Sequence, residues 1–324
     1  MSEHLVAVGS QHAKVADREA PREAIEPLQF HTADGWEPIT TWSAVGTLGI
    51  SALVWDEPTD SVWIATDDTL WKVTDEAVTR VAADPLVDIH ELRVHGRRLT
   101  IASTGMDTVV TVDLDRGEEV GRDVLGAERT DAVTGAFVKA TGRTERFHAN
   151  QAFEDRGGRR WALVHHVTGL QVVQEVASRL LKRQGDGGLV SLDGLAPVDL
   201  GLSAPHSMRQ VGDDWWVLDS GAGTARILDE AWGPIDTMVV GGWGRGATVL
   251  PDGSLAIGIS AVRPRYRQRL QDFGDVDNHV AIIDPGTRTV VERVTVPRVD
   301  QLNAVESLPS RAIELLQAAA PPTA

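Results

Sequence analysis

The sequence predicts an all-β protein built as a six-bladed β-propeller, and three observations lead to this fold class. First, the 324-residue chain matches itself without a gap at a shift of 116 residues, which places His90 on His206 and Gly96 on Gly212. Second, half that shift, 58 residues, places His90 on His148. Third, each repeat reads as short apolar strands separated by turns rich in Gly and Asp. Four-stranded units of about 40–50 residues that repeat in this way close into a ring.

The strands of the repeat can be placed in chain order. The first complete unit begins with strands at residues 50–55 and 62–66, joined by a turn at residues 56–60. Third strands end in Asp, and we expect them at residues 108–113, 189–193, 225–229 and 280–284. Blades one to five therefore lie within residues 48–300.

The last blade needs strands from both ends of the chain. Residues 303–309 resemble the start of the preceding unit, but little chain follows them. Residues 4–8 and 24–30 are strand-like, so we expect residues 1–45 to close the ring. Residues 301–324 then hold the start of the last blade and a short helix that Ser310 caps. The whole chain, residues 1–324, is predicted as one domain, with seven blades or an open β-sandwich as alternatives.

Two longer segments interrupt blades between their second and third strands, where both open on one face of the ring. Residues 170–185 carry apolar side chains at helical spacing, and residues 261–276 are rich in Arg. Because Arg pairs with carboxylate and phosphate groups, Arg263, Arg265 and Arg267 are predicted to bind an anionic substrate. The alternative is that these side chains pair with the protein's own acidic surface.

Composition narrows the choice of partners. The formal net charge is −16, which argues against nucleic acid as a partner. The sequence has no Cys, so disulfides and thiolate chemistry are excluded. No apolar run approaches the ~20 residues of a membrane helix and no secretory signal is seen, so we expect a cytoplasmic protein without a membrane partner. The excess of Arg over Lys is typical of a GC-rich bacterial genome.

Three histidines occupy one register of consecutive repeats. The first strand of each blade lines the central channel of a propeller, so His90, His148 and His206 should meet at one mouth of that channel. Three neutral imidazoles that face a common point suit a divalent transition metal, namely Fe, Mn, Zn, Ni or Cu. Two other interpretations stay open: metal-free catalytic or substrate-binding histidines, and histidines that only bond backbone carbonyls.

Further polar residues should lie beside these histidines. The second strand of a blade ends where its first strand begins, so the ends of second strands join the same mouth. This places His165, His166 and Asp219 there as candidate catalytic groups, with Asp219 able to orient a ligand histidine. Arg245 is predicted as a catalytic group and Asn303 as a substrate-binding group, because both share the register of the histidines.

These patterns resemble known propellers. Residues 48–300 resemble the six-bladed gluconolactonase and strictosidine synthase-like superfamily, and Pro205-His-Ser-Met-Arg with Trp216-Val-Leu-Asp-Ser-Gly is similar to an uncharacterised bacterial propeller family. The first resemblance implies calcium bound by Glu, Asn and Asp at the ends of inner strands. Of the matching positions here, only Asn303 suits that pattern; the full set is Ile50, His90, His148, His206, Arg245 and Asn303.

The sequence thus predicts a metal-dependent enzyme with a His-rich site at the channel mouth, acting on a small anionic organic substrate. The reaction class stays open among lyase, hydrolase, isomerase and oxygenase. The alternatives are a non-catalytic propeller that serves as a binding platform, and a calcium-dependent lactonase-like hydrolase. The oligomeric state does not follow from the residues.

Overall fold

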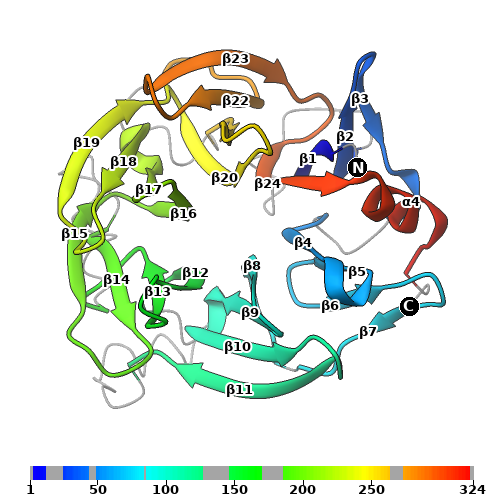
Figure 1. The fold of residues 1–324 in the computed structure, drawn as a ribbon, viewed down its shortest axis with the longest axis horizontal. Coiled ribbons are helices and arrows are strands. Elements are labelled where there is room, and N and C mark those ends of the chain that lie inside the picture. The colour runs from blue at the N-terminus through cyan, green and yellow to red at the C-terminus, as the bar shows by residue number, and fades with distance from the viewer. Residues whose placement is uncertain are drawn as a thin grey trace.

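A computed structural model describes residues 3–11, 25–43, 49–83, 85–126, 146–169, 185–262 and 273–321. Within these ranges the strands form six antiparallel four-stranded sheets, which follow one another around a central channel (Figure 1). The six-bladed propeller is therefore confirmed, and the seven-bladed and open-sandwich alternatives are wrong. No helix in this part of the chain is long and apolar enough to span a membrane.

Each blade runs from an innermost to an outermost strand. The innermost strands are β4 (Ala52–Asp56), β8 (Ile89–His95), β12 (Ala149–Glu154), β16 (Pro205–Val211), β20 (Trp243–Val249) and β24 (Gln301–Pro309). The second strands are β5 (Ser61–Ala65), β9 (Arg98–Ser103), β13 (Arg160–Val164), β17 (Asp214–Asp219), β21 (Leu255–Ser260) and β1 (Glu3–Ser10). The third strands are β6 (Leu70–Val73), β10 (Thr108–Asp113), β14 (Gly187–Ser191), β18 (Thr224–Leu228), β22 (His279–Asp284) and β2 (Leu28–Thr32). The outermost strands are β7 (Val78–Arg80), β11 (Glu118–Val124), β15 (Val198–Leu202), β19 (Pro234–Val239), β23 (Thr289–Thr295) and β3 (Gly35–Pro38).

The two ends of the chain share the closing blade. Its order is β24-β1-β2-β3, so the C-terminal part supplies the innermost strand and the N-terminal part supplies the other three. The pairing of β1 with β24 extends from Glu3 opposite Pro309 to Ser10 opposite Gln301. A long antiparallel ladder therefore holds the ring shut, as the strand-like N-terminal segments predict.

The predicted terminal helix is present as α4 (Ser310–Ala318). It begins after Pro309, which is the N-cap residue, and no side-chain hydrogen bond caps it, so the expected cap by Ser310 is wrong. Ser310 is the first helical residue, and its hydroxyl oxygen lies 3.1 Å from Nε2 of His4. The other end of the helix is fixed by the buried Trp42, whose Nε1 donates to the carbonyl of Leu316.

The apolar core is divided among the interfaces between neighbouring blades. Trp63 of β5 packs with Leu99 and Ile101 of β9, for example, and Trp216 of β17 packs with Ile257 of β21. Since each blade buries one face against each neighbour, the centre of the ring is left to the side chains of the innermost strands.

The innermost strands share an irregularity that shapes the channel. Each of β8, β12, β16 and β20 contains one extra residue relative to its second strand, and the bulge falls just after the histidine register. Strand residues two apart normally face the same side, so one extra residue brings positions three apart to the same side. His90 and Arg93 on β8, and likewise His206 and Arg209 on β16, therefore contribute to two successive layers of the channel.

Candidate functional site

Four imidazole rings from three consecutive blades meet in the channel. His90 lies on β8, His206 lies on β16, His148 directly precedes β12, and His165 directly follows β13. Ring centroids are 5.2 Å apart for His90 and His148, 4.1 Å for His148 and His165, 5.2 Å for His165 and His206, and 6.2 Å for His90 and His206. We call these four residues the histidine cluster. The three histidines of the repeat register thus lie together, and His165 joins them.

Hydrogen bonds fix the tautomers of two members of the cluster. Nδ1 of His206 lies 3.0 Å from the carbonyl oxygen of Ala204 and 2.9 Å from Oγ of Ser220. A carbonyl oxygen only accepts, so Nδ1 of His206 carries the proton and Nε2 carries the lone pair. In His90, Nε2 faces Oδ1 of Asp88 at 3.3 Å, while Nδ1 is buried without a hydrogen-bond partner. Asp88 therefore directs the lone pair of His90 to Nδ1.

Burial keeps these imidazoles neutral. Loss of solvent lowers the pKa of His90, and lowers the pKa of His165 and of His206 well below the usual value. Neighbouring imidazoles add to the effect, and the positive charge of Arg245 on β20 lowers the pKa of His90 and His206 further. Asp88 alone raises the pKa of His90, through its negative charge and its hydrogen bond. Neutral imidazoles with buried lone pairs can accept a proton or bind a cation.

His148 is positioned by a carboxylate that sequence reasoning missed. Asp107 is buried in the turn after β9, and it accepts hydrogen bonds from the backbone N–H groups of Arg146, Phe147 and His148, the last at 3.0 Å. His148 itself has a left-handed backbone with φ of 55°. Three bonds to one carboxylate hold this uncommon conformation, which turns the residue before β12 toward the other histidines.

Other predicted residues lie near the cluster in different roles. Asp219 accepts from the backbone N–H of Ser203 at 2.7 Å and lies 3.5 Å from Nε of Arg226, whereas His206 is bonded by the neighbouring Ser220. The ring of His166 lies edge-on to that of His165 with the centroids 6.2 Å apart, and its Nδ1 lies 3.7 Å from Oδ1 of Asp186. The catalytic roles expected for Asp219 and His166 stay predictions.

Asn303 links the closing blade to the first one. Its Nδ2 donates to the carbonyl of Ile50 at 2.7 Å, and its Oδ1 accepts from Gln301 at 3.2 Å. Both ends of this buried amide are therefore engaged within the protein. The amide oxygen that a calcium ion would need is the one already bonded to Gln301.

The fit of a transition metal to the cluster is partial. Nδ1 of His90 and Nε2 of His165 are buried nitrogens without hydrogen-bond partners, as expected of groups that await a ligand. In the arrangement described, however, His148 and His165 stack at an interplanar angle of 22°, which keeps their lone pairs in nearly parallel planes. Among the described residues, no group of three or more His, Cys, Asp or Glu side chains is arranged so that it could hold a metal ion.

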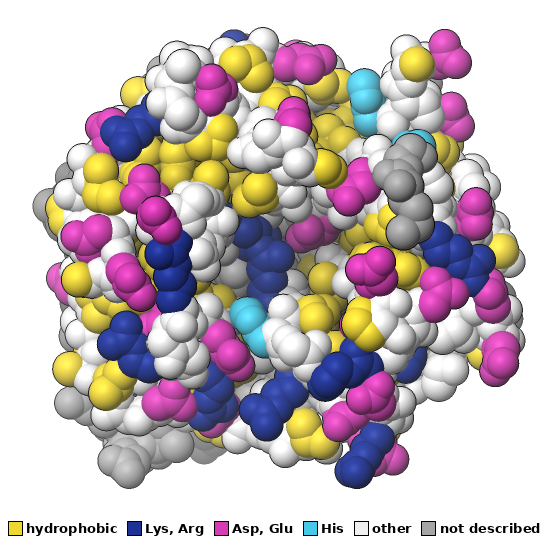
Figure 2. Space-filling view, in the orientation of Figure 1, with side chains coloured by type: hydrophobic (Ala, Val, Ile, Leu, Met, Phe, Trp, Pro, Cys, Tyr) yellow, Lys and Arg dark blue, Asp and Glu magenta, His cyan; other side chains and the backbone are white. Residues whose placement is uncertain are grey.

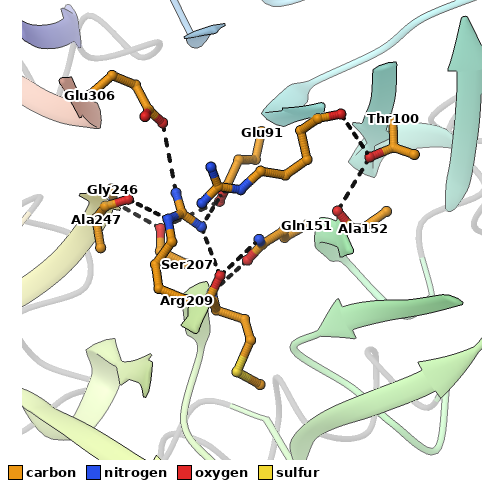
Figure 3. Close-up of polar contacts among 11 residues, drawn as sticks. Glu91, Thr100, Gln151, Ala152, Ser207, Arg209, Gly246, Ala247 and Glu306 are labelled. Carbon is orange, nitrogen blue, oxygen red and sulfur yellow. Dashed lines mark hydrogen bonds and ion pairs between the residues drawn. The ribbon is translucent and has the colours of Figure 1, made fainter. Parts of the chain in front are cut away.

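A second polar layer lies in the same channel, and we call its members Glu91, Arg93, Arg209 and Glu306 the arginine layer (Figure 3). Oε1 of Glu91 lies 2.7 Å from Nη1 of Arg209 and 3.2 Å from Nε of Arg93. Nη2 of Arg209 lies 3.8 Å from Oε1 of Glu306. Burial raises the pKa of Glu91 to about 7 and that of Glu306 to about 8, because a desolvated carboxylate is costly.

The repeat itself carries a signal for this layer. Of the six positions three residues after the histidine register, one holds Leu53 and five hold polar residues, namely Arg93, Gln151, Arg209, Thr248 and Glu306. All five are polar and lie on innermost strands, where an apolar residue would be expected if the position faced a blade interface. The bulge explains why the position three residues on, rather than two, shares the channel with the histidines.

The predicted inserts fall largely outside the described residues, and Arg263, Arg265 and Arg267 lie there with them, so their contact with substrate stays a prediction. The ends of the first insert are described. Gly169 donates its N–H to the carbonyl of His166, and Val167 bonds the carbonyl of Asp186. That insert therefore leaves and rejoins the propeller directly beside the histidine cluster.

Fold and site together define a six-bladed propeller with a polar, histidine-lined channel. The chain belongs to the family described as Domain of unknown function (DUF4915), whose model matches residues 134–315. No curated protein matches the chain. The cytoplasmic location stays a prediction.

Several solved structures share the fold at low sequence identity. A protein of unknown function from Bacteroides caccae is 12% identical with a TM-score of 0.61, and the match covers 95% of this chain and 99% of that one. A chain of a nidogen/laminin complex is 11% identical with a TM-score of 0.58 over 95% and 99% of the two chains. A luciferin-regenerating enzyme is 11% identical with a TM-score of 0.53 over 93% and 83%. Enzymes and binding proteins thus both use this architecture, so the site has to carry the functional argument.

Proposed function

We propose that the histidine cluster is the active site of an enzyme that acts on a small anionic organic molecule. The observation that carries this proposal is the meeting of four imidazoles, three of them desolvated, of which His90 and His206 have tautomers fixed by their hydrogen bonds. A histidine with a purely structural role is expected to have its buried ring nitrogens hydrogen-bonded. Nδ1 of His90 and Nε2 of His165 are instead buried without a hydrogen-bond partner. Perturbed, unsatisfied groups gathered in a channel are typical of a functional site.

The roles follow from where protons and charges lie. With no metal bound, His90 accepts a proton at Nδ1 while Asp88 stabilises the resulting imidazolium through Nε2. Arg245 provides the positive charge that attracts the anionic group, since its field already acts on both His90 and His206. Proton removal next to a carboxylate or phosphate is shared by lyases and isomerases, and an activated water gives a hydrolase.

We further propose a divalent transition metal as cofactor, with His90, His148 and His206 as its ligands and His165 beside them. The unpaired ring nitrogens of His90 and His165 support this proposal. When bound, such a metal would supply Lewis-acid charge at the cluster. The stacked pair of His148 and His165 would have to separate for His148 to bind the metal.

One set of measurements tests both proposals. The purified protein and its His90→Ala and His148→Ala variants are analysed for bound metal, titrated with Mn, Fe, Ni, Cu and Zn ions, and screened with small organic acids for thermal stabilisation and turnover. The matched control is His31→Ala, because His31 lies on β2, the third strand of the closing blade, where its ring contacts that of Trp36. We expect both cluster variants to stay folded and lose ligand binding at least tenfold, with the control unchanged.

The outcomes separate the two proposals. Metal binding that is equal in the wild type and His148→Ala, or absent from both, overturns the cofactor proposal and leaves the metal-free enzyme. Organic acids that bind and turn over equally in the wild type and His90→Ala overturn the active-site proposal. The binding platform and the calcium-dependent lactonase-like hydrolase stay predictions, and the engaged amide of Asn303 gives the latter no support.

A further inference from the structure

The arginine layer contains two carboxylates that are held very differently. Glu91 is bound closely by both arginines, and its Oε2 lies 3.4 Å from the hydroxyl group of Ser207. Glu306 on β24 lies at the longer distance of 3.8 Å from Nη2 of Arg209 and accepts a side-chain hydrogen bond from Thr248, while the charge of Arg93 acts on it from further away. Figure 3 shows Arg209 lying between the two carboxylates. Glu306 is therefore the member of the layer that can most easily lose its charge.

The nitrogens of the Arg209 guanidinium have different partners. Nε donates a hydrogen bond to the carbonyl of Ala247. Nη1 donates to the carbonyl of Met208 at 2.9 Å and forms an ion pair with Glu91. Nη2 is the nitrogen directed toward Glu306. When Glu306 is protonated, this end of a buried guanidinium loses its countercharge, which is costly in a medium poorer in water than bulk solvent.

When Glu306 is protonated, the channel carries more positive than negative charge. With Glu306 neutral, Arg93 and Arg209 face the single carboxylate of Glu91, and Arg245 on β20 adds a further positive charge near Glu91. The other groups that act on Glu306 are the charges of Arg93 and Glu91 and the uncharged Thr248. Figure 2 shows a hollow at the centre of the ring with basic side chains inside it. The arginines of the innermost strands are Arg93, Arg209 and Arg245.

We propose that the arginine layer is a second anion-binding site, in which a small oxyanion takes the place of the Glu306 carboxylate at Arg209 and binding is coupled to uptake of a proton by Glu306. The oxyanion would be of the carboxylate, sulfate or phosphate class, which matches a guanidinium group. This site is separate from the histidine cluster and does not depend on the function proposed for it.

Because binding is coupled to protonation of Glu306, the affinity for the anion should fall as the pH rises. Burial places the pKa of Glu306 at about 8, and the anion binds the protonated form, so binding takes up almost no proton at pH 6 and approaches one proton above pH 9. The dissociation constant should rise about tenfold per pH unit above pH 8. Glu91, with a pKa of about 7, is ionised throughout that range and gains a proton below it, so the slope above pH 8 is the one assigned to Glu306.

Sulfate is the suitable probe because it does not titrate in this range. Binding of sodium sulfate is measured by isothermal titration calorimetry from pH 6 to pH 10, at constant ionic strength and in buffers of different ionisation enthalpy. We expect the tenfold slope and the proton uptake in the wild type. Glu306→Gln should bind sulfate without the tenfold slope above pH 8 and without proton uptake in that range. His148→Ala should keep the wild-type slope, because it leaves the arginine layer intact.

Other outcomes overturn the proposal. Absence of sulfate binding at pH 6 to a folded wild type does so, as does a tenfold slope above pH 8 that persists in Glu306→Gln. A thermal-shift series controls for misfolding: sulfate should raise Tm of the wild type more at pH 8 than at pH 10, and should raise Tm of Glu306→Gln equally at both. Arg209→Gln, if folded, should bind sulfate at least tenfold more weakly, and unchanged binding by that variant also overturns the site.

Discussion

Thr104 and Ser220 lie 116 residues apart at the same position of two repeats, and each hydroxyl group donates a hydrogen bond to a backbone carbonyl of the following blade. Thr104 bonds the carbonyl of Ala149, and Ser220 bonds that of Gly244. The repeat thus reuses one hydroxyl position to fix the start of the next innermost strand. The hydroxyl oxygen of Ser220 also contacts Nδ1 of His206.

This pair of hydroxyl groups gives a matched experiment. Ser220→Ala and Thr104→Ala should each lower the free energy of unfolding by about 1–2 kcal/mol, because each removes one buried hydrogen bond between blades. Only Ser220→Ala should change the ring nitrogen shifts of His206 in ¹⁵N NMR spectra, since Thr104 has no contact with that ring among the hydrogen bonds described. Equal spectra for the two variants would show that Ala204 alone orients His206.

Acid should destabilise the protein through the histidine cluster. His90, His165 and His206 have lowered pKa values in the folded state, while unfolded chains bind protons near pH 6.5. Below pH 6.5 each of these histidines therefore binds more protons in the unfolded state and lowers stability with a slope of up to about 1.4 kcal/mol per pH unit, whereas Glu91 and Glu306, whose pKa values are raised in the folded state, contribute with the opposite sign. Urea unfolding between pH 7.5 and 5 measures this slope. It should be smaller in His165→Gln, and an unchanged slope would contradict the assignment.

Asp107 should matter more for stability than an exposed turn carboxylate. Asp107→Ala leaves three backbone N–H groups at residues 146–148 without their acceptor, so we expect a loss of about 3 kcal/mol. Asp252→Ala is the control, because Asp252 bonds Ser254 in an exposed turn and should cost less than about 1 kcal/mol. Both values come from denaturant titrations, and similar losses in the two variants would contradict the special role of Asp107.

Gly246 tests the bulge in β20. It has φ of 81°, and a Cβ atom there would lie 2.5 Å from the backbone nitrogen of Val305. Gly246→Ala therefore forces β20 and β24 apart and should cost more than the ~1 kcal/mol expected of a positive φ alone. Gly253 has φ of 84° and open space around it, so Gly253→Ala isolates that backbone cost. If thermal unfolding shows equal losses, the bulge tolerates a side chain and the close approach is unimportant.

Much of the fold could be predicted because its information is local and repeated. Strand positions follow from apolar runs between Gly- and Asp-rich turns, and the predicted third strand at residues 108–113 is observed as β10. The closing blade followed from counting: the last unit lacks outer strands and the N-terminal segments provide them. The failure at Ser310 is also local, since a serine one residue after the true N-cap looks the same in sequence.

The site was predicted only in part, because its contacts cross between blades. The repeat register brought His90, His148 and His206 together, but not the stacking of His148 on His165 or the support of His148 by Asp107. Arg209 and Glu306 are 97 residues apart in the sequence, and no local pattern pairs them.

By itself, the sequence determined the blades, their order around the ring and the positions that line the channel, since these follow from a pattern that each repeat carries within its own strands. The tertiary structure decided which of those side chains meet, which nitrogen of His90 and His206 is protonated, and which carboxylates lose solvent. The physical reason is that a bulge of one residue changes the side on which every later residue of a strand faces, and closure of the ring then sets distances across the channel. Desolvation, hydrogen bonding and ion pairing depend on those distances and not on the spacing of residues along the chain.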